Sequence, residues 1–175
     1  FKTVSAPEEG LHCALAVVEQ GDTLDFALAF SKISLADAEQ KAMQAATADW
    51  DAACASKLAF YQKLPVAENL DPEIEKTLYK CFSVMKTQVY SPEGRFSTLW
   101  TTPDRLPHRR CWLWDSVFHA LGNRHISPQL AYQTLEALFS FQREDGLISH
   151  MAGPRDASPV TQPPIIAWGF CSLYD

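Results

Sequence analysis

The densest concentration of chemically useful side chains lies between residues 100 and 119. This stretch holds three tryptophans, two histidines, two aspartates and three arginines. A pyranose ring has apolar C–H faces and a rim of hydroxyl groups, so a sugar site needs flat aromatic surfaces beside carboxylates and hydrogen-bond donors. Trp112, Trp114 and Asp115 offer that combination within four positions. The segment therefore predicts a carbohydrate-binding site.

A helix that starts near Trp114 or Asp115 and ends around Asn123 is expected to carry these residues. On such a helix Asp115, Phe118 and His119 have the i, i+3 and i+4 spacing that places side chains on one face. A second interpretation stays open, in which the tryptophans belong to the core and Asp115 only caps the helix.

A second polar segment runs from Gln142 to His150, and Gln162 follows it just before two prolines. Amides, imidazoles and carboxylates on loops that meet at one face suit the recognition of sugar hydroxyls. We expect His150 and Gln162 to join the same site. The alternative for Gln162 is that it only neighbours a helix cap.

The first elements along the chain are predicted to be two strands. Residues 11–18 and 24–30 are mostly apolar, and a turn that contains Gly21 separates them, as in a β-hairpin. Because one hairpin is not stable alone, it should be the last edge of a larger sheet domain or a strand pair docked on helices.

Five helices are predicted after the hairpin, from their caps, prolines and apolar spacing. They are expected at 34–63, from Asp71-Pro72 to Ser91-Pro92, at 114–123, from Ser127-Pro128, and from Thr161 onward. Apolar stripes are expected on the second and fourth of them, at Ile74, Leu78, Phe82, Met85 and Val89, and at Leu130, Thr134, Leu135, Leu138 and Phe139. The long loops 91–111 and 142–162 sit at alternate joints, so they should meet at one end of the helical array.

The string Trp-Leu-Trp-Asp-Ser-Val-Phe-His at 112–119, with Trp-Thr-Thr-Pro-Asp at 100–104 and Gln-Pro-Pro at 162–164, resembles glycoside hydrolase family 63. It is most similar to the bacterial members that act on glucosylglycerate, mannosylglycerate or short α-glucosides, and the resemblance covers roughly residues 24–175. It implies a mainly α fold: part of an (α/α)6 toroid, preceded by a β-hairpin from a β-sandwich-type domain.

The resemblance also implies a domain division. Residues 1–33 would be the end of an N-terminal β domain or a docked hairpin, and residues 34–175 the first part of an (α/α)6 catalytic domain, truncated at its C-terminal end. The chain starts at Phe1 without an initiator Met and stops within an apolar run, so we expect a piece of a longer or processed protein. The rest of the catalytic domain is then an expected partner, as a continuation or as a second chain.

Roles for individual residues follow from the same resemblance. Trp112 and Asp115 would bind the sugar whose bond is cleaved, His150 and Gln162 would complete that subsite, and Trp114 and Phe118 would form supporting walls. The general acid Asp and the general base Glu are expected downstream, so no catalytic residue is assigned in this chain. Family members invert the anomeric centre, which requires two carboxyl groups about 6.5–9.5 Å apart.

Two other functions stay open. A trehalase-like enzyme is favoured by the Trp-Asp-Ser triplet, although Pro92-Glu93-Gly94-Arg95-Phe96 only approximates the trehalase signature P-G-G-R-F. A non-catalytic helical carbohydrate-binding module would also fit the short chain.

The composition excludes several kinds of partner and cofactor. The net charge of -6, with no Lys/Arg cluster beyond Arg109-Arg110, argues against nucleic acid as a partner. No apolar stretch reaches the roughly 20 residues of a membrane span, and we expect a cytoplasmic protein without a membrane partner. The five histidines lack metal-ligand spacing, so no metal and no cofactor are expected. The five scattered cysteines are expected to be mostly buried.

Overall fold

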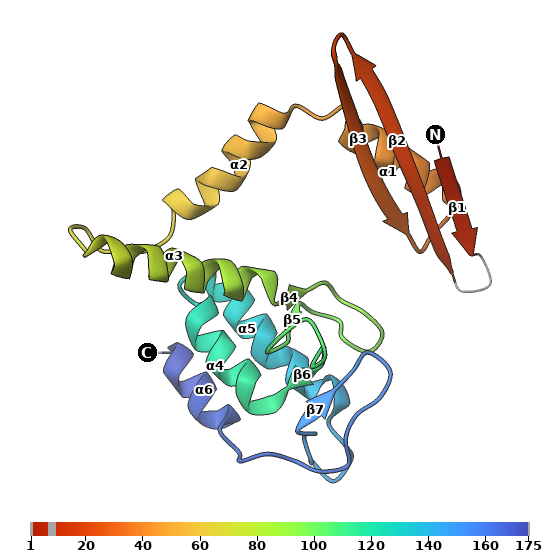
Figure 1. Ribbon diagram of the computed structural model, residues 1–175. Coiled ribbons are helices and arrows are strands. Elements are labelled where there is room, and N and C mark those ends of the chain that lie inside the picture. The colour runs from red at the N-terminus through yellow and green to blue at the C-terminus, as the bar shows by residue number, and fades with distance from the viewer. Residues whose placement is uncertain (1, 7–9, 175) are drawn as a thin grey trace. The chain divides into compact units, whose positions relative to one another are not determined.

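The computed structural model describes residues 2–6 and 10–174 (Figure 1). The chain divides into two compact units, Phe1–Gln62 and Lys63–Asp175. Among the described residues there are six α-helices, several short strands and one longer three-stranded sheet. The fold is therefore mainly α, while the toroid and the domain boundary at residue 33 stay predictions.

The first unit contains the predicted hairpin. Strands β2 (Leu11–Gln20) and β3 (Thr23–Ser31) pair antiparallel around a two-residue turn, in which Gly21 adopts a φ of 59°. A third strand, β1 (Lys2–Ala6), pairs with the other edge of β2, so the strand order is β1-β2-β3. The hairpin prediction is confirmed.

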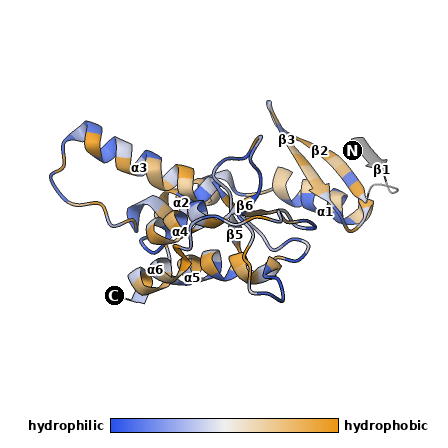
Figure 2. Cartoon of the chain, turned by 90° about the horizontal axis from the view of Figure 1, so that it is seen from below, coloured by the Kyte–Doolittle hydropathy of each residue, from blue (hydrophilic) through white to orange (hydrophobic). Residues whose placement is uncertain are grey.

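Helix α1 (Leu35–Ala46) packs on one face of this sheet through small side chains. Its buried residues Ala38, Ala42 and Ala46 recur every four positions and meet the buried Ala14 and Ala16 of β2. Alanine at these positions lets the helix lie close to the sheet. The opposite face carries larger side chains, so β2 and β3 are hydrophobic along most of their length (Figure 2). On β3 the exposed ones are Leu24, Phe26, Leu28 and Phe30.

The prediction of one long helix over residues 34–63 is wrong. The segment forms two helices, α1 and α2 (Trp50–Gln62), with a break at residues 47–49. The carboxylate of Asp49 accepts a hydrogen bond from the backbone N–H of Ala52 at 2.9 Å and so starts a new helix. Asp and Thr side chains compete with the helix backbone for hydrogen bonds, and the alanine-rich composition concealed this second cap.

The second unit starts with α3 (Pro72–Thr87), which Asp71 caps as predicted. Strands β4 (Val89–Tyr90) and β5 (Trp100–Thr101) pair, and β6 (Cys111–Trp112) pairs with β7 (Met151–Ala152). Helices α4 (Leu113–Asn123), α5 (Pro128–Glu136) and α6 (Ile166–Tyr174) pack against one another (Figure 1). A Cβ on Gly169 of α6 would lie 2.8 Å from Val117 of α4, so these two helices approach closely.

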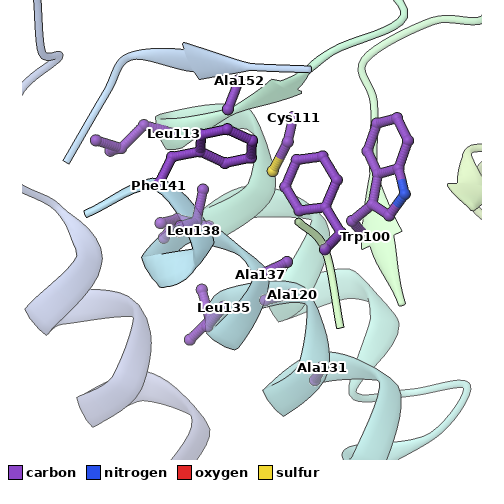
Figure 3. Close-up of a cluster of buried hydrophobic side chains, with 12 residues drawn as sticks. Trp100, Cys111, Leu113, Ala120, Ala131, Leu135, Ala137, Leu138, Phe141 and Ala152 are labelled. Atoms are coloured by element: carbon purple, nitrogen blue, oxygen red, sulfur yellow. The ribbon is translucent and has the colours of Figure 1, made fainter. Parts of the chain in front are cut away.

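The core of the second unit lies between α4, α5, the 3₁₀-helix that follows α5, and the short strands β5, β6 and β7 (Figure 3). Trp100 is fully buried and stacks on Phe96 and Tyr90, with ring centroids 4.7 and 4.8 Å away. Its indole N–H donates to the carbonyl oxygen of Ser91. The core interpretation is thus correct for Trp100, and it does not hold for Trp114, which is 45% exposed.

Two predicted apolar stripes need correction. Ile74 at the start of α3 is 54% exposed, so the half-buried part of that stripe begins at Leu78. Phe139 is 39% exposed because the chain tightens into a 3₁₀-helix at Ala137–Phe141. The change from 3.6 to 3 residues per turn moves Phe139 off the buried face, where the α-helical period had placed it.

The cysteine prediction is also wrong. Of the five cysteines, all of them free thiols, only Cys111 is buried, while Cys54, Cys81 and Cys171 are exposed. No helix among the described residues combines the length and the apolar character that crossing a membrane requires.

Candidate functional site

The long loops 91–111 and 142–162 meet, as predicted. Cys111 and Trp112 pair with Ala152 and Met151, and the backbone N–H of Arg95 donates to the carbonyl oxygen of Pro154 at 2.9 Å. The contact brings the start of α4 to the middle of the second loop.

Two glycines allow this close approach. Gly94 has a φ of +59°, and a Cβ built on it would lie 2.1 Å from the carbonyl oxygen of Pro154. A Cβ on Gly153 would lie 3.1 Å from a guanidinium nitrogen of Arg110 in the first loop and 2.6 Å from a carboxylate oxygen of Asp156 in the second. A larger residue at position 94 would push the two loops apart, since the atom it meets belongs to the backbone.

An ion pair fastens the same two loops. The guanidinium of Arg110 makes two hydrogen bonds to the carboxylate of Asp156, at 2.8 and 3.0 Å. Hydrogen bonding from Arg110 lowers the pKa of Asp156 below its ordinary value. Because the pair is largely exposed, it contributes mainly geometry and little stability.

A small hollow opens where α4 begins. It encloses about 270 Å³, and its walls are Pro103, His108, Trp112, Trp114, Asp115 and Gln162. The size lies just below the roughly 300–1,000 Å³ of pockets that hold drug-sized ligands, so it suits one small ring. Two indoles, one carboxylate, one imidazole and one amide thus line a space large enough for one small ring.

Gln162 caps α4 from the second loop. Its side-chain oxygen accepts a hydrogen bond from the backbone N–H of Trp114 at 3.1 Å, which caps α4 from 48 positions further along the chain. Trp112, at the N-cap position, makes no side-chain cap of its own. Since the oxygen is engaged, the amide NH₂ group of Gln162 supplies the donors that this residue can offer to a ligand.

His150, which was expected to complete the same subsite, does not line the hollow and contacts only Trp112 of its walls. The two rings meet edge to face, with centroids 5.5 Å apart. The carbonyl oxygen of His150 accepts from the backbone N–H of Leu113 at 2.9 Å, so His150 also helps to start α4. Its Nδ1 lies 3.3 Å from the carbonyl oxygen of Val160, and a carbonyl only accepts, so Nδ1 carries the proton.

Sequence reasoning did not assign His108, although it lines the hollow. Its Nδ1 lies 2.8 Å from a carboxylate oxygen of Asp104, and its ring meets Trp112 at a centroid distance of 6.1 Å. The signal in the sequence was the Asp–His spacing of four within a short proline-containing segment, which allows the two side chains to pair.

Phe118 and His119 are not among the residues that line the hollow. Phe118 is 56% exposed and meets Trp168 of α6, with ring centroids 6.1 Å apart. His119 Nδ1 lies 3.0 Å from the hydroxyl of Thr101 on β5. Although the i, i+3 and i+4 spacing holds, neighbouring elements draw these two side chains to contacts of their own.

Asp115 lies in the first turn of α4, where the helix dipole favours a negative charge. The charge of Asp115 also affects the pKa of two neighbouring groups, Cys111 and His119. Burial raises the pKa of the Cys111 thiol to about 11, and the charge of Asp115 adds to that rise. Burial lowers the pKa of His119, and the charge of Asp115 opposes that shift.

A larger hollow of about 610 Å³ lies nearby, between the 145–148 segment and the start of α6. Its walls are mainly aliphatic, with Asp145 and Thr161 as the polar exceptions and without an aromatic platform. The smaller hollow matches sugar chemistry better. No group of three or more potential metal ligands occurs among the described residues.

Comparison with known proteins places the match on the same residues. Residues 108–175 fit the family model described as the mannosylglycerate hydrolase MGH1-like glycoside hydrolase domain. The resemblance to these glycoside hydrolases is confirmed. The matched range includes every residue that lines the hollow except Pro103.

Individual relatives agree with the family model. The chain is 35% identical over 85 residues to a mannosylglycerate hydrolase of Thermus thermophilus. The match covers 37% of this chain and 20% of that protein. It is 29% identical over 75 residues to mannosylglycerate hydrolase MGH2 of Selaginella moellendorffii, covering 32% of this chain and 15% of that protein. The chain thus matches about a fifth or less of the length of these curated relatives.

Proposed function

We propose that this chain is the sugar-binding part of an inverting glycoside hydrolase that acts on a small α-linked mannoside or glucoside, such as mannosylglycerate or glucosylglycerate. The observation that carries the proposal is the convergence of Trp112, Trp114, Asp115 and Gln162 on one hollow of saccharide size. The similarity of residues 108–175 to the mannosylglycerate hydrolase-like domain supports the choice of substrate class.

In this proposal the chain holds the glycosyl unit. The indole of Trp112 packs on the apolar C–H face of the ring, and Trp114 forms part of the wall. The carboxylate of Asp115 accepts hydrogen bonds from sugar hydroxyls, while the NH₂ group of Gln162 donates to one. These bonds favour the distorted ring of the transition state if they strengthen as the ring flattens.

The proposal places the general acid and the general base outside residues 1–175. Inversion needs two carboxyl groups on opposite sides of the sugar with a water molecule between one of them and the anomeric carbon. Asp115 is the only carboxylate among the residues that line the hollow. The helices of the second unit would accordingly be the first part of an (α/α)6 toroid that the remainder of the protein closes.

The test is hydrolysis by the full-length protein. Mannosylglycerate, glucosylglycerate and trehalose are supplied separately, and proton NMR follows the configuration of the sugar as it is released. We expect turnover of a glycosylglycerate with inversion. Preferred turnover of trehalose would favour the trehalase-like alternative, and binding without turnover of any glycoside would favour the non-catalytic module.

A second measurement tests whether residues 1–175 bind the sugar without hydrolysing the glycoside. Titration calorimetry on residues 1–175 should show binding of the sugar, and the same chain should release no product. Hydrolysis by this chain alone would contradict the placement of the acid and base outside it.

A further inference from the structure

The segment Trp-Thr-Thr-Pro-Asp at 100–104 leads into a turn that forms one wall of the candidate sugar hollow, and the roles proposed above do not use its two threonines. Pro103 and His108 supply that wall. Thr102 stands directly before Pro103 and is fully buried. Because buried polar groups are almost always hydrogen-bonded, the partners of the Thr102 hydroxyl show what it holds in place.

The hydroxyl of Thr102 connects the two ends of the turn. It lies 2.7 Å from the carbonyl oxygen of Asp104 and 2.7 Å from that of His108. Both oxygens can only accept, so the hydroxyl is the donor and shares its one hydrogen between them. The carboxylate of Asp104 closes the turn a second time, since it accepts from the backbone N–H of His108 at 3.0 Å. Thr and Asp side chains commonly hold turns through such local bonds to the backbone.

The carbonyl oxygen of His108 extends this network to the candidate sugar platform. It accepts from the indole N–H of Trp112 at 3.3 Å and from the backbone N–H of Arg110 at 2.6 Å. The position of this oxygen therefore decides where the indole N–H finds its acceptor. The ring of Trp112 lines the hollow, so the Thr102 hydroxyl is linked to the orientation of that ring through one shared oxygen.

The chain around Thr102 is fixed to the helices on either side of it in sequence. The backbone N–H of Thr102 donates to the carbonyl oxygen of Gln88, at the end of α3, at 3.2 Å. The hydroxyl of the buried Thr101, in β5, lies 3.0 Å from Nδ1 of His119 in α4. Since α4 also supplies Trp114 to the hollow, the turn starts from a point that is fixed relative to the helix that carries other walls of the hollow.

We propose that Thr102 is a positioning residue of the sugar site: its hydroxyl fixes the 104–108 turn and, through the carbonyl oxygen of His108, the indole of Trp112. The inference rests on the proposed function and adds to it a residue that does not itself line the hollow. A ring that is positioned in advance loses little freedom when the sugar binds, whereas a turn that can open must be ordered at a cost in affinity. Removal of this one hydroxyl should therefore weaken binding while every wall residue stays in the sequence.

The experiment uses three variants of the full-length protein. Thr102→Val keeps the branched shape of the side chain and removes the hydroxyl, while Thr102→Ser keeps the hydroxyl. Thr134→Val is the matched control, because Thr134 is also fully buried and its hydroxyl donates to the carbonyl oxygen of Leu130 at 2.8 Å, within α5. Hydrolysis of mannosylglycerate and of glucosylglycerate is measured for each variant, together with its thermal midpoint.

We expect Thr102→Val to raise KM about tenfold, equivalent to about 1.4 kcal/mol, which is within the range for one hydrogen bond. The change should lie in KM with kcat within about twofold, because the indole packs on the sugar in the ground state and in the transition state alike. Thr102→Ser should restore KM to within about twofold of the wild type. Thr134→Val should lower the thermal midpoint and leave KM unchanged, since loss of folded protein reduces only the apparent kcat.

A second readout does not depend on hydrolysis. In protein that contains isotope-labelled tryptophan, the indole N–H signal of Trp112 is assigned by its disappearance in Trp112→Phe. Thr102→Val should shift this signal because the acceptor of the indole N–H moves. Thr102→Ser and Thr134→Val should leave it in place.

An unchanged KM in Thr102→Val would overturn the assignment, as would a KM in Thr102→Ser that is as high as in Thr102→Val. An indole signal of Trp112 that stays in place in Thr102→Val would also overturn it. Failure of the proposed function looks different: the wild-type protein would hydrolyse neither glycoside, while the indole signal would still report whether Thr102 orients Trp112.

Discussion

The side-chain oxygen of Gln162 lies 3.1 Å from the backbone nitrogen of Trp114 and accepts its hydrogen, although 48 positions separate the two residues. One amide therefore closes the second long loop onto α4 and also faces the candidate sugar site. Structure and binding depend on different atoms of the same side chain, which makes them separable by mutation.

Gln162→Ala should destabilise the protein, and Gln162→Glu should not. Alanine removes the acceptor that caps α4, which costs about 0.5–2 kcal/mol of unfolding free energy. Glutamate keeps an acceptor oxygen at a helix start that favours negative charge, but it loses the NH₂ donors. Urea denaturation measures the first effect, and calorimetric titration with the glycosylglycerate measures the second.

Both variants are expected to bind the sugar more weakly than the wild type. Loss of one neutral hydrogen bond, worth about 0.5–1.5 kcal/mol, corresponds to roughly a threefold to tenfold change in Kd. Unchanged affinity in Gln162→Glu would show that the amide donors do not face the ligand.

Asp115→Asn in the full-length protein should weaken catalysis without abolishing it. A hydrogen bond to a charged group is worth about 1.5–3 kcal/mol, so kcat/KM should fall by roughly ten- to a hundredfold. The loss should be smaller on a substrate with a better leaving group, since the chemistry itself is intact. Added azide gives the control: if it restores a complete loss of activity, Asp115 is the base itself.

Gly94→Ala should destabilise the protein more than Gly146→Ala. Both glycines have a positive φ, which costs an alanine roughly 1–2 kcal/mol. Only at Gly94 does the added methyl also meet the backbone of Pro154, whereas Gly146 faces open space. The comparison of the two midpoints in urea therefore isolates the contact between the loops.

The loop contact also matters for the site. Because Gly94 allows the 142–162 loop to approach α4, Gly94→Ala should weaken sugar binding, while Gly146→Ala should leave it unchanged. Equal stability of the two variants would mean that the loops adjust without cost.

Local signals were enough to predict where α3 and α5 begin, but not the short strands β6 and β7 that pair beside the site. Ser127-Pro128 and Asp71-Pro72 start α5 and α3 where expected, because caps and prolines act within one helical turn. The meeting of the two long loops followed from their alternate positions in the helical array. The break at Asp49 was missed because alanine-rich sequence favours a helix on both sides of it.

The detailed geometry of the site depends on contacts that periodicity does not contain. The face shared by Asp115 and His119 was correct as helix geometry, yet the ring of His119 bonds to Thr101 on a separate strand. His108 was overlooked because its importance comes from Asp104 and from a loop shape that no periodic pattern describes. The sequence likewise did not separate the tryptophans: Trp100 is buried in the core, whereas Trp114 is exposed.

Cys111 should resist alkylation in the folded protein, whereas Cys54, Cys81 and Cys171 should react. Burial raises the pKa of Cys111 to about 11, and the thiolate is the reactive form. Relative to an ordinary thiol with a pKa of about 8.5, the thiolate fraction of Cys111 at pH 8 is roughly two hundredfold smaller. Mass spectrometry of the iodoacetamide-treated protein measures the order of reaction. Modification of Cys111 at the rate of Cys171 would show that the β6–β7 contact opens readily.

His119 should make the unfolding free energy fall as the pH is lowered through about 6.5. Its pKa in the folded protein is lowered by burial, so the unfolded chain takes up the proton first. The stabilising contribution is therefore present above the unfolded pKa and is lost as the pH drops toward the folded one, with a slope of at most about 1.4 kcal/mol per pH unit. His119→Asn keeps a donor near Nδ1 for Thr101 and removes the titration. Urea denaturation of both proteins between pH 7.5 and pH 5.5 gives the difference in slope, and parallel curves would mean that His119 is protonated as easily in the folded chain as in the unfolded one.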